Sequence, residues 1–227
     1  GQLEPRVLAA MSGDKGLARA AAAGDLYAAL AQDAFGGDRP RAKIGLLAAM
    51  YGQTSGEAGQ LLAVMRRRFP AALALVESAA RTGEAGGIVR SQLGRTSPAP
   101  SAERFFAEGG EGGDGGADPG DAASPDRRAA RSWGRFTRNF VIQASASDWA
   151  LAMLAALRRR LAEIGPAPRL VFFQHDEVIV HTPLDLAPRV EAAVTAAGEE
   201  ARRLVFGPTP VPIPLQTHAV ECYADAK

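Results

Sequence analysis

An acidic, low-complexity segment from Glu108 to Asp126, EGGEGGDGGADPGDAASPD, divides the chain into two parts. Such a segment buries too little apolar surface to offset the entropy lost on ordering, so it predicts a disordered insertion, which we place at 99–131. Folded structure is therefore expected on either side of it. The 227 residues suffice for one large domain or two small ones with a sizeable core.

The charge of the chain is unevenly distributed. Residues 103–126 hold seven acidic side chains and one basic side chain, and the rest of the chain holds 25 basic against 18 acidic residues. The overall net charge of +1 therefore hides a basic remainder. That remainder is compatible with a polyanionic partner but does not require one.

Three further features bear on the cellular setting. No apolar run approaches the roughly 20 residues that a membrane span needs, and the start of the chain lacks the pattern of a signal peptide. The single cysteine, Cys222, cannot form an internal disulfide. We therefore expect a cytoplasmic protein with no membrane partner.

The part before the insertion is predicted to be mostly helical. After a short strand-like start, a helix should begin at Pro5 and end at Gly13. Asp38 is a suitable N-cap for a later helix that has Pro40 in its first turn. The remaining expected elements are helices at 24–36, 56–69 and 70–83, and a hairpin at 86–98 with its turn near Leu93 and Gly94.

The part after the insertion is predicted to contain the sheet. Two helices are expected, 127–146 and 147–165, with Ser147 as the N-cap of the second. They should be followed by a hairpin of strands Arg169–Phe173 and Val178–His181, a helix at 186–207 and a closing strand at 211–223. The fold class is therefore α+β, an antiparallel sheet with helices on one face, joined to a helical subdomain.

One predicted helix carries a candidate nucleotide-binding face. Four of its side chains recur every four residues and share that face: Arg39, Lys43, Leu47 and Tyr51. The two cations lie near the positive N-terminal end of the helix, and the other two side chains offer a stacking surface. The pattern suits a nucleoside triphosphate; the alternative is a surface helix with an apolar edge in the core.

The tip of the predicted β-hairpin carries two adjacent acids, Asp176 and Glu177. Because neighbouring strand residues face opposite sides, Asp176 can point at a site while Glu177 supports it. Carboxylates at such a turn bind hard cations such as Mg²⁺, and two ions can hold the attacking and leaving oxygens of phosphoryl transfer. The alternatives are an ordinary polar turn and zinc bound by His175 and His181.

A polar face is predicted on the helix after the insertion. Arg135, Asn139 and Gln143 are spaced four residues apart, so they share one face. A guanidinium and two amides in line can hydrogen-bond base edges or sugars of a duplex. A solvated polar face is the alternative.

Taken in order, five segments resemble those of the family A DNA polymerases, the bacterial DNA polymerase I type. They are QLEPRVLAAMSGD (family form D-Y-S-Q-I-E-L-R), RAKIGLLAAMYG (K-x-x-x-F-G-x-x-Y-G), GGIVRSQLGR (G-Y-V-x-T-x-x-G-R), RNFVIQASASD (I-N-x-x-x-Q-G-x-x-A-D) and FFQHDEVIV (Q-V-H-D-E). The resemblance runs from residue 1 to about Tyr223, broken by the insertion. Each motif alone is weak, whereas their order along the chain is specific.

The resemblance implies roles in catalysis and nucleotide binding. Asp176 resembles the ligand of catalytic Mg²⁺ (two ions, with Mn²⁺ as a substitute), and Glu177 its neighbour at the primer end. Lys43 resembles the general acid for pyrophosphate departure, a role that arginine fills poorly because guanidinium holds its proton tightly. Glu4, with Tyr51, resembles the steric gate against a ribose 2′-OH. The implied dNTP-binding residues are Gln2, Glu4, Arg39, Lys43, Leu47 and Tyr51.

The resemblance also implies contacts with primer–template DNA. His175 resembles the residue at the primer terminus, and Arg6 matches the arginine of the first motif. The full implied set of DNA-binding residues is Arg6, Arg90, Arg95, Arg135, Asn139, Gln143 and His175.

Three positions depart from the family pattern. Leu47 stands where the family has Phe or Tyr, Ala48 replaces a Gly, and Gln174 replaces a Val. These departures suggest a divergent branch of the family, similar to the one found in high-GC bacteria. The family's first metal-binding Asp is expected two residues before Gly1.

The resemblance implies palm segments at 1–24 and 132–227 and fingers at 25–98, within a longer protein that acts as a monomer. The implied function is template-directed DNA synthesis in replication or repair, in which dNTPs are added to a primer 3′-OH. We expect the 227-residue chain by itself to be inactive. A non-catalytic DNA-binding module that keeps the fold is the alternative, and a metal phosphodiesterase would need more His and Asp ligands.

Overall fold

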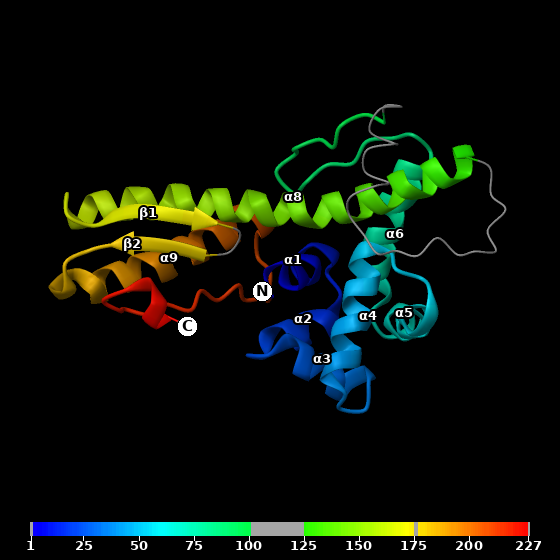
Figure 1. Cartoon of the computed structure of the whole chain (residues 1–227), viewed down its shortest axis with the longest axis horizontal. Coiled ribbons are helices and arrows are strands. Elements are labelled where there is room, and N and C mark those ends of the chain that lie inside the picture. Colours follow the sequence, from blue (N-terminus) through cyan, green and yellow to red (C-terminus); the bar gives the residue numbers. More distant parts are fainter. Residues whose placement is uncertain (1, 101–124, 175–176, 227) are drawn as a thin grey trace.

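The computed structural model describes residues 2–100, 125–174 and 177–226 and has an α+β fold, as predicted. The elements are α1 (Leu3–Ser12), α2 (Lys15–Ala22), α3 (Leu26–Ala34), α4 (Arg39–Tyr51), α5 (Gly56–Arg68), α6 (Pro70–Glu84), α8 (Pro125–Ile164), β1 (Arg169–Gln174), β2 (Glu177–His181), η1 (Leu184–Leu186), α9 (Ala187–Phe206) and η2 (Tyr223–Ala226). Helix α8 runs along the whole molecule, with α1–α6 packed at one end and the hairpin and α9 at the other (Figure 1).

Aspartate N-caps define the starts of three helices in the first half. Asp14, Asp25 and Asp38 accept hydrogen bonds from the first free N–H groups of α2, α3 and α4, respectively. The predicted helices at 24–36, 56–69 and 70–83 and the predicted helix capped by Asp38 are confirmed. Two predictions fail: α2 was not foreseen, and the expected strand-like start is helical from Leu3.

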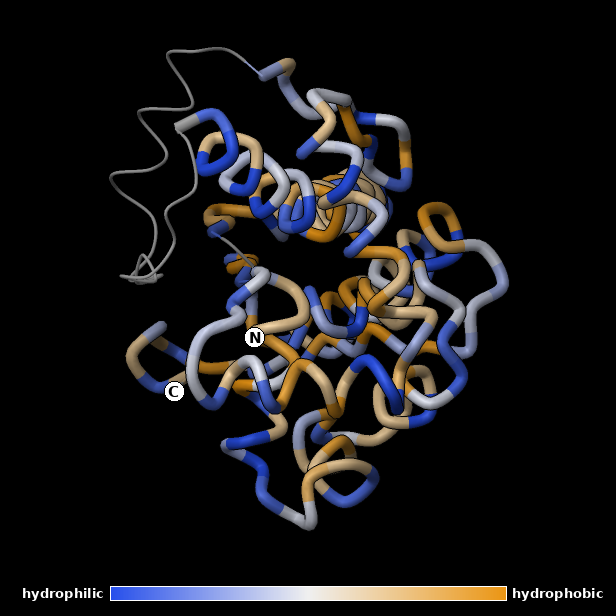
Figure 2. The backbone as a smooth tube through the Cα atoms, turned by 90° about the vertical axis from the view of Figure 1, so that its right-hand side faces the viewer, coloured by the Kyte–Doolittle hydropathy of each residue, from blue (hydrophilic) through white to orange (hydrophobic). Residues whose placement is uncertain are grey.

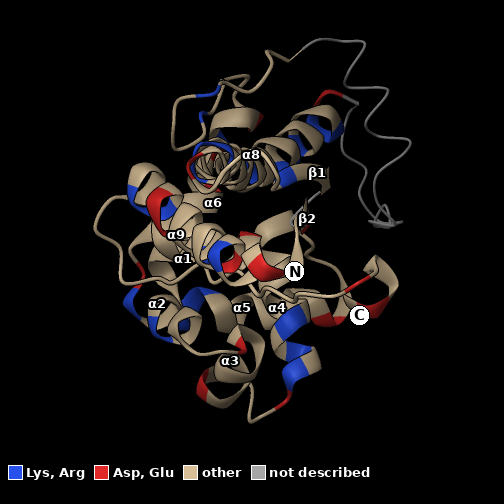
Figure 3. Ribbon diagram, turned by 90° about the vertical axis from the view of Figure 1, so that its left-hand side faces the viewer, with Lys and Arg blue, Asp and Glu red and all other residues tan. Residues whose placement is uncertain are grey.

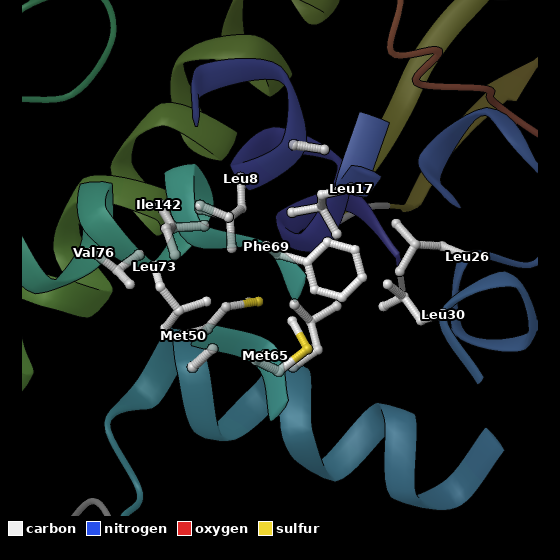
Figure 4. Packing of buried hydrophobic residues seen from close by; sticks show 14 of the residues in the cluster. Leu8, Leu17, Leu26, Leu30, Met50, Met65, Phe69, Leu73, Val76 and Ile142 are labelled. Atoms are coloured by element: carbon white, nitrogen blue, oxygen red, sulfur yellow. The ribbon is translucent and has the colours of Figure 1, made fainter. Parts of the chain in front are cut away.

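The core of the first half forms around Phe69, at the junction of α5 and α6. Phe69 is fully buried and lies among Leu8, Leu17, Met50 and other side chains of the same cluster (Figure 4). Apolar stretches of the chain gather where the helices meet, and hydrophilic stretches lie at the periphery (Figure 2). This packing holds α1 and α4 in fixed relation to each other.

Helix α8 is continuous, which contradicts the predicted break at Ser147. The polar side chains near that position bind the 88–97 hairpin instead of capping a new helix. The Ser145 hydroxyl donates to Val141 O within the helix and accepts from Gln92 N–H, and Asp148 accepts from Leu93 N–H. The polar signal at 145–148 therefore reflects a tertiary contact rather than a helix start.

The 88–97 hairpin forms a tight turn, as predicted near Gly94. Arg90 and Thr96 pair as an isolated antiparallel bridge, and Gly94 adopts φ +89°. Few other residue types adopt that backbone conformation. The turn is held against α8, so its orientation is set by the long helix.

By length and composition, α8 could cross a membrane over Asp126–Ile164, among the helices that the structure describes. Of the most apolar stretch of this helix, however, 61% is buried inside the protein, where α8 packs against α6 and α9. A buried core helix can have the same length and apolar composition as a membrane span. The apolar character of α8 is thus accounted for by the protein core.

The second half contains a two-stranded antiparallel sheet. β1 pairs with β2 from Arg169↔His181 to Gln174↔Glu177, with an irregularity between Leu170 and Phe172, so both predicted strands are confirmed. Helices α8 and α9 supply a second core cluster, against which side chains of both strands pack. Leu3 of α1 packs against this cluster and also against the first one, which joins the two halves.

Two predictions about this half are wrong. The segment 211–223 forms no strand in the structure. Prolines at every second position from Pro208 to Pro214 remove the N–H donors that one edge of such a strand would need. The predicted insertion also extends too far, because α8 begins at Pro125. Residues 101–124 lie outside the described part of the chain.

Candidate active site

The candidate nucleotide-binding face lies on α4, as predicted. Its N-cap is Asp38, Pro40 stands in its first turn, and Gly52 ends it with φ +76°. Several Lys and Arg positions lie along α4 (Figure 3), and Arg39 and Lys43 are exposed. The structure thus presents the predicted cations to solvent, and their binding to a triphosphate stays a prediction.

The two ends of this face differ in burial. Leu47 and Tyr51, at its C-terminal end, are half-buried. Lys43 forms no ion pair with any residue that the structure describes. The face therefore combines an accessible cationic end with a partly enclosed apolar and aromatic end.

Arg39 is held by two neighbours on α3. Its Nε donates to Asp25 Oδ2 at 2.7 Å, and its Cζ lies 5.5 Å from the centre of the Tyr27 ring. The Arg39 hydrogen bond lowers the pKa of the Asp25 carboxyl, and the backbone N–H groups of α3 act in the same direction. Asp25 is a part of the site that the motif comparison missed.

The structure brings the predicted steric-gate pair together from α1 and α4. The Tyr51 hydroxyl donates to Glu4 Oε2 at 2.6 Å. Burial is the largest cause that raises the pKa of Tyr51 above its ordinary value, followed by the hydrogen bond to Glu4. Gln143 of α8 acts on the same hydroxyl and lowers its pKa, so three separate elements meet here.

We expect Tyr51→Phe to reduce the free energy of unfolding by about 1 kcal/mol at pH 8, because the half-buried Glu4 carboxylate loses its donor. The difference from wild type should shrink as the pH rises above about 10. There the unfolded chain releases the Tyr51 proton, whereas the folded protein retains it and becomes less stable. Urea unfolding at pH 8 and pH 11 measures both effects.

Tyr27→Phe is the matched control for this variant. The Tyr27 ring is 5% exposed, and no described residue hydrogen-bonds its hydroxyl. We expect its loss at pH 8 to be smaller than that of Tyr51→Phe. Equal losses in the two variants would show that the Tyr51–Glu4 hydrogen bond contributes nothing measurable.

The placement of Arg6 contradicts the expected DNA contact. Arg6 is 4% exposed, and its terminal nitrogens donate to the carbonyls of Ala21, Ala23, Gly24 and Pro212 and to the side chain of Gln2. Burial lowers the pKa of its guanidinium. Arg6 is thus a structural residue that ties α1 to the α2–α3 loop and to the C-terminal segment.

Gln2, predicted to bind the nucleotide, is also engaged within the protein. Its amide oxygen accepts from Leu26 N–H, and its amide nitrogen donates to Asp25 Oδ1 at 3.4 Å. A direct nucleotide contact would require this amide to leave its partners. That contact stays a prediction.

The predicted DNA-binding face of α8 is only partly available. Arg135 and Gln143 are exposed, and Arg135 lies against Gly52 at the end of α4. The side-chain oxygen of Asn139, in contrast, is buried and accepts no hydrogen bond from a described residue. Arg138, which the sequence comparison did not single out, is buried and donates to Ala49 O of α4.

The other two predicted DNA-binding arginines lie on the 88–97 hairpin. Arg90 is exposed. Arg95 donates to the buried carboxylate of Asp148, with Nη2 to Oδ1 at 3.3 Å. The hairpin therefore presents Arg90 and the half-exposed Arg95 from a fixed base on α8, and their contact with DNA stays a prediction.

The strand ends that flank the predicted catalytic turn lie beside the start of α1 in two perpendicular views (Figures 1 and 3). Glu177, the first residue of β2, is exposed and accepts from the Tyr223 hydroxyl at 2.6 Å. His175 and Asp176 lie outside the described residues. The ends of β1 and β2 thus lie near the start of α1, and the position of Asp176 itself stays undescribed.

The described residues do not form a metal site. No group of three or more His, Cys, Asp or Glu side chains in that part of the chain could hold a metal ion. The zinc alternative stays untested, because His175 lies outside the described residues; His181 pairs with Arg169, at the opposite end of β2 from Glu177. Four residues of strand separate those ends by about 13 Å.

Comparisons with known proteins bear on the family and the fold of the chain. A family model described as DNA polymerase family A matches residues 1–224. The chain is also similar in structure to a chain described as the POL domain of Pol1 from M. smegmatis in complex with DNA primer–template and dNTP, with TM-score 0.71 and 21% sequence identity. That match covers 94% of this chain and 37% of the other.

A search of curated proteins finds no match. At 21% identity the structural likeness shows the fold, and the family match over nearly the whole sequence shows the family. The chain belongs to DNA polymerase family A.

Proposed function

We propose that the full-length protein carries out template-directed DNA synthesis, in which a primer 3′-OH attacks the α-phosphate of a bound dNTP. The observation that carries the proposal is the meeting of the cationic and aromatic face of α4 with Glu4 of α1, through the 2.6 Å Tyr51–Glu4 hydrogen bond. Membership of DNA polymerase family A and the fold it shares with a DNA-bound polymerase domain support it.

In this proposal the exposed cations of α4 bind the triphosphate. Arg39 offers its guanidinium to phosphate oxygens, and Lys43, four residues further on the same face, binds the leaving pyrophosphate and donates a proton to it. A lysine suits the second role because an ammonium releases its proton more readily than a guanidinium does. Tyr51 and Leu47 then lie on the side of the sugar and base.

Glu4 would discriminate against ribonucleotides. Its carboxylate is fixed by Tyr51, so it cannot move aside without breaking a charge-assisted hydrogen bond. A ribose 2′-OH would need the space that this half-buried carboxylate occupies, and the hydrogen bond from Tyr51 prevents the carboxylate from making room for it. The substrates proposed for the site are therefore deoxynucleoside triphosphates.

The part played by divalent ions rests on the sequence alone. The described residues supply no group of side chains that could hold a metal ion. Asp176, which the sequence assigns as the ligand of Mg²⁺ or Mn²⁺, lies outside the described residues. Its role is proposed and is tested by mutation.

The proposed partners are primer–template DNA and dNTPs. Exposed Arg135, Gln143, Arg90 and Arg95 would contact the duplex, largely through its phosphates and sugars. We further propose that the protein is a cytoplasmic monomer that acts in DNA replication or repair.

Primer extension by the full-length protein tests the function. On a heteropolymeric template we expect incorporation only of the dNTP that matches the template base. The alternative, a DNA-binding module that keeps the fold, predicts primer–template binding without incorporation. Binding without extension under any divalent-ion condition would overturn the proposed activity in favour of that alternative.

A further inference from the structure

We propose that Asp25 is a positioning residue for nucleotide binding, which fixes the Arg39 guanidinium and leaves its terminal nitrogens for the phosphates of the dNTP. The inference rests on the proposed function, because it assumes that Arg39 binds the triphosphate. It adds to that function a residue outside the motifs that the sequence shares with the family.

The orientation of the Asp25 carboxylate is set by α3 rather than by Arg39. Asp25 is the N-cap of α3, and its Oδ1 accepts from the backbone N–H groups of Tyr27 at 3.0 Å and Ala28 at 3.2 Å. The Gln2 amide donates to the same oxygen at 3.4 Å. Oδ1 is thus engaged three times, which directs Oδ2 toward Arg39 without any contribution from the arginine.

The loop that carries Asp25 is itself held by a buried side chain of α1. The buried guanidinium of Arg6 donates to the carbonyls of Ala23 and Gly24, the two residues before Asp25, both at 3.1 Å. It also donates to the Gln2 amide oxygen at 3.2 Å. A chain of hydrogen bonds therefore runs from the protein interior to the exposed end of α4.

Arg39 is fixed in two directions and still accessible. Its Nε donates to Asp25 Oδ2 at 2.7 Å, and the guanidinium lies over the ring of Tyr27, which is 5% exposed and cannot easily turn. The Arg39 side chain remains 50% exposed. Neither terminal nitrogen donates a hydrogen bond to a described residue.

The geometry argues for positioning rather than for competition with phosphate. An acid that competed for the arginine would bind its terminal nitrogens, the fork that matches phosphate oxygens. Asp25 takes Nε and leaves that fork open. A mobile arginine loses side-chain entropy when it binds a ligand. Because Arg39 is already held in the folded protein, that entropy cost does not fall on the binding step, which favours binding.

Asp25→Asn is the variant that tests the inference. Asn is as good an N-cap as Asp, so α3 keeps its start, but the charge-assisted bond to Arg39 is lost. We expect the Kd of a matched dNTP to rise about 3- to 10-fold, measured with the full-length protein on a dideoxy-terminated primer–template. The affinity for the primer–template and the melting temperature should not change, whereas a purely structural role would alter both.

Glu57→Gln is the matched control. It breaks a similar ion pair on the same helix, Arg41 Nε to Glu57 Oε1 at 3.0 Å, which joins α4 to α5 instead of α3. This variant should bind the dNTP like wild type. In an Arg39→Ala background, which itself weakens dNTP binding, Asp25→Asn should cause no further loss.

The outcomes separate this inference from the proposed function. If Arg39→Ala weakens dNTP binding and Asp25→Asn leaves it unchanged or tightens it, Asp25 does not position Arg39. If Arg39→Ala has no effect on dNTP binding, the triphosphate does not bind at this face, and the proposed nucleotide site fails with the inference. A loss in Asp25→Asn that persists at higher salt supports positioning, because a screened charge effect would fade.

Discussion

Asp176→Ala in the full-length protein is expected to lower the rate of primer extension by about 10³-fold or more. The proposed role of this carboxylate is to bind the catalytic divalent ion, and in the described part of the chain no group of His, Cys, Asp and Glu side chains could hold a metal ion in its place. Primer–template binding depends on exposed arginines and should change by less than about threefold. Single-turnover extension and DNA-binding assays measure the two effects separately.

Asp185→Ala is the control for that experiment. Asp185 is an exposed acid on η1, shortly after β2, so its replacement removes the same charge from the same region of the surface. It should extend primers at the wild-type rate. Equal activity of wild type and Asp176→Ala would remove Asp176 from the active site and with it the proposed role of the hairpin.

The parts of the site that the sequence predicts correctly depend on local signals. Helix α4 is bounded by an aspartate N-cap, an early proline and a glycine at positive φ, and these features act within a few residues of each other. The four-residue spacing then fixes which side chains share a face. The hairpin strands are likewise set by the apolar runs on either side of the turn.

The parts that the sequence does not predict depend on contacts between distant residues. Arg6 and Pro212 are 206 positions apart, and only the folded chain shows that the guanidinium of Arg6 donates its hydrogen bonds to backbone carbonyls. Asp25 and Arg39 belong to different helices, so no motif links them. A family motif preserves residue type, and type alone does not separate a buried arginine from one that contacts DNA.

The same reasoning explains the errors in secondary structure. Ser145 and Asp148 have the residue types of a helix start, yet they are occupied by backbone N–H groups of the 88–97 hairpin. The local preference of these residues for a helix start was therefore overridden by their hydrogen bonds to the hairpin. In the final segment Val211 and Ile213 are buried, but the prolines prevent the strand pairing that was predicted there.

The crossing of α6 and α8 determines how the site elements are held together, since α8 also contacts α1 and α4. Gly83 of α6 faces Thr137 of α8 at this crossing. A Cβ at Gly83 would overlap the Thr137 hydroxyl and would lie 2.8 Å from its Cγ2 and 2.9 Å from Trp133 O. Thr137 is fully buried, and its hydroxyl donates to Ala79 O at 2.8 Å, so it has little room to move.

Gly83→Ala should therefore reduce the free energy of unfolding by about 3 kcal/mol, through overpacking and strain on the Thr137 hydrogen bond. Urea unfolding followed by circular dichroism measures the loss. In a Thr137→Ala background the penalty should fall to about half, because the overlapping atoms are gone while Trp133 O remains.

Gly24→Ala, where no atom lies within 4 Å of the added Cβ, should change stability by less than about 0.5 kcal/mol. A tolerated Gly83→Ala would mean that α6 and α8 do not approach as closely as this crossing requires, and the positions of Arg135 and Gln143 beside α4 would then need to be revised.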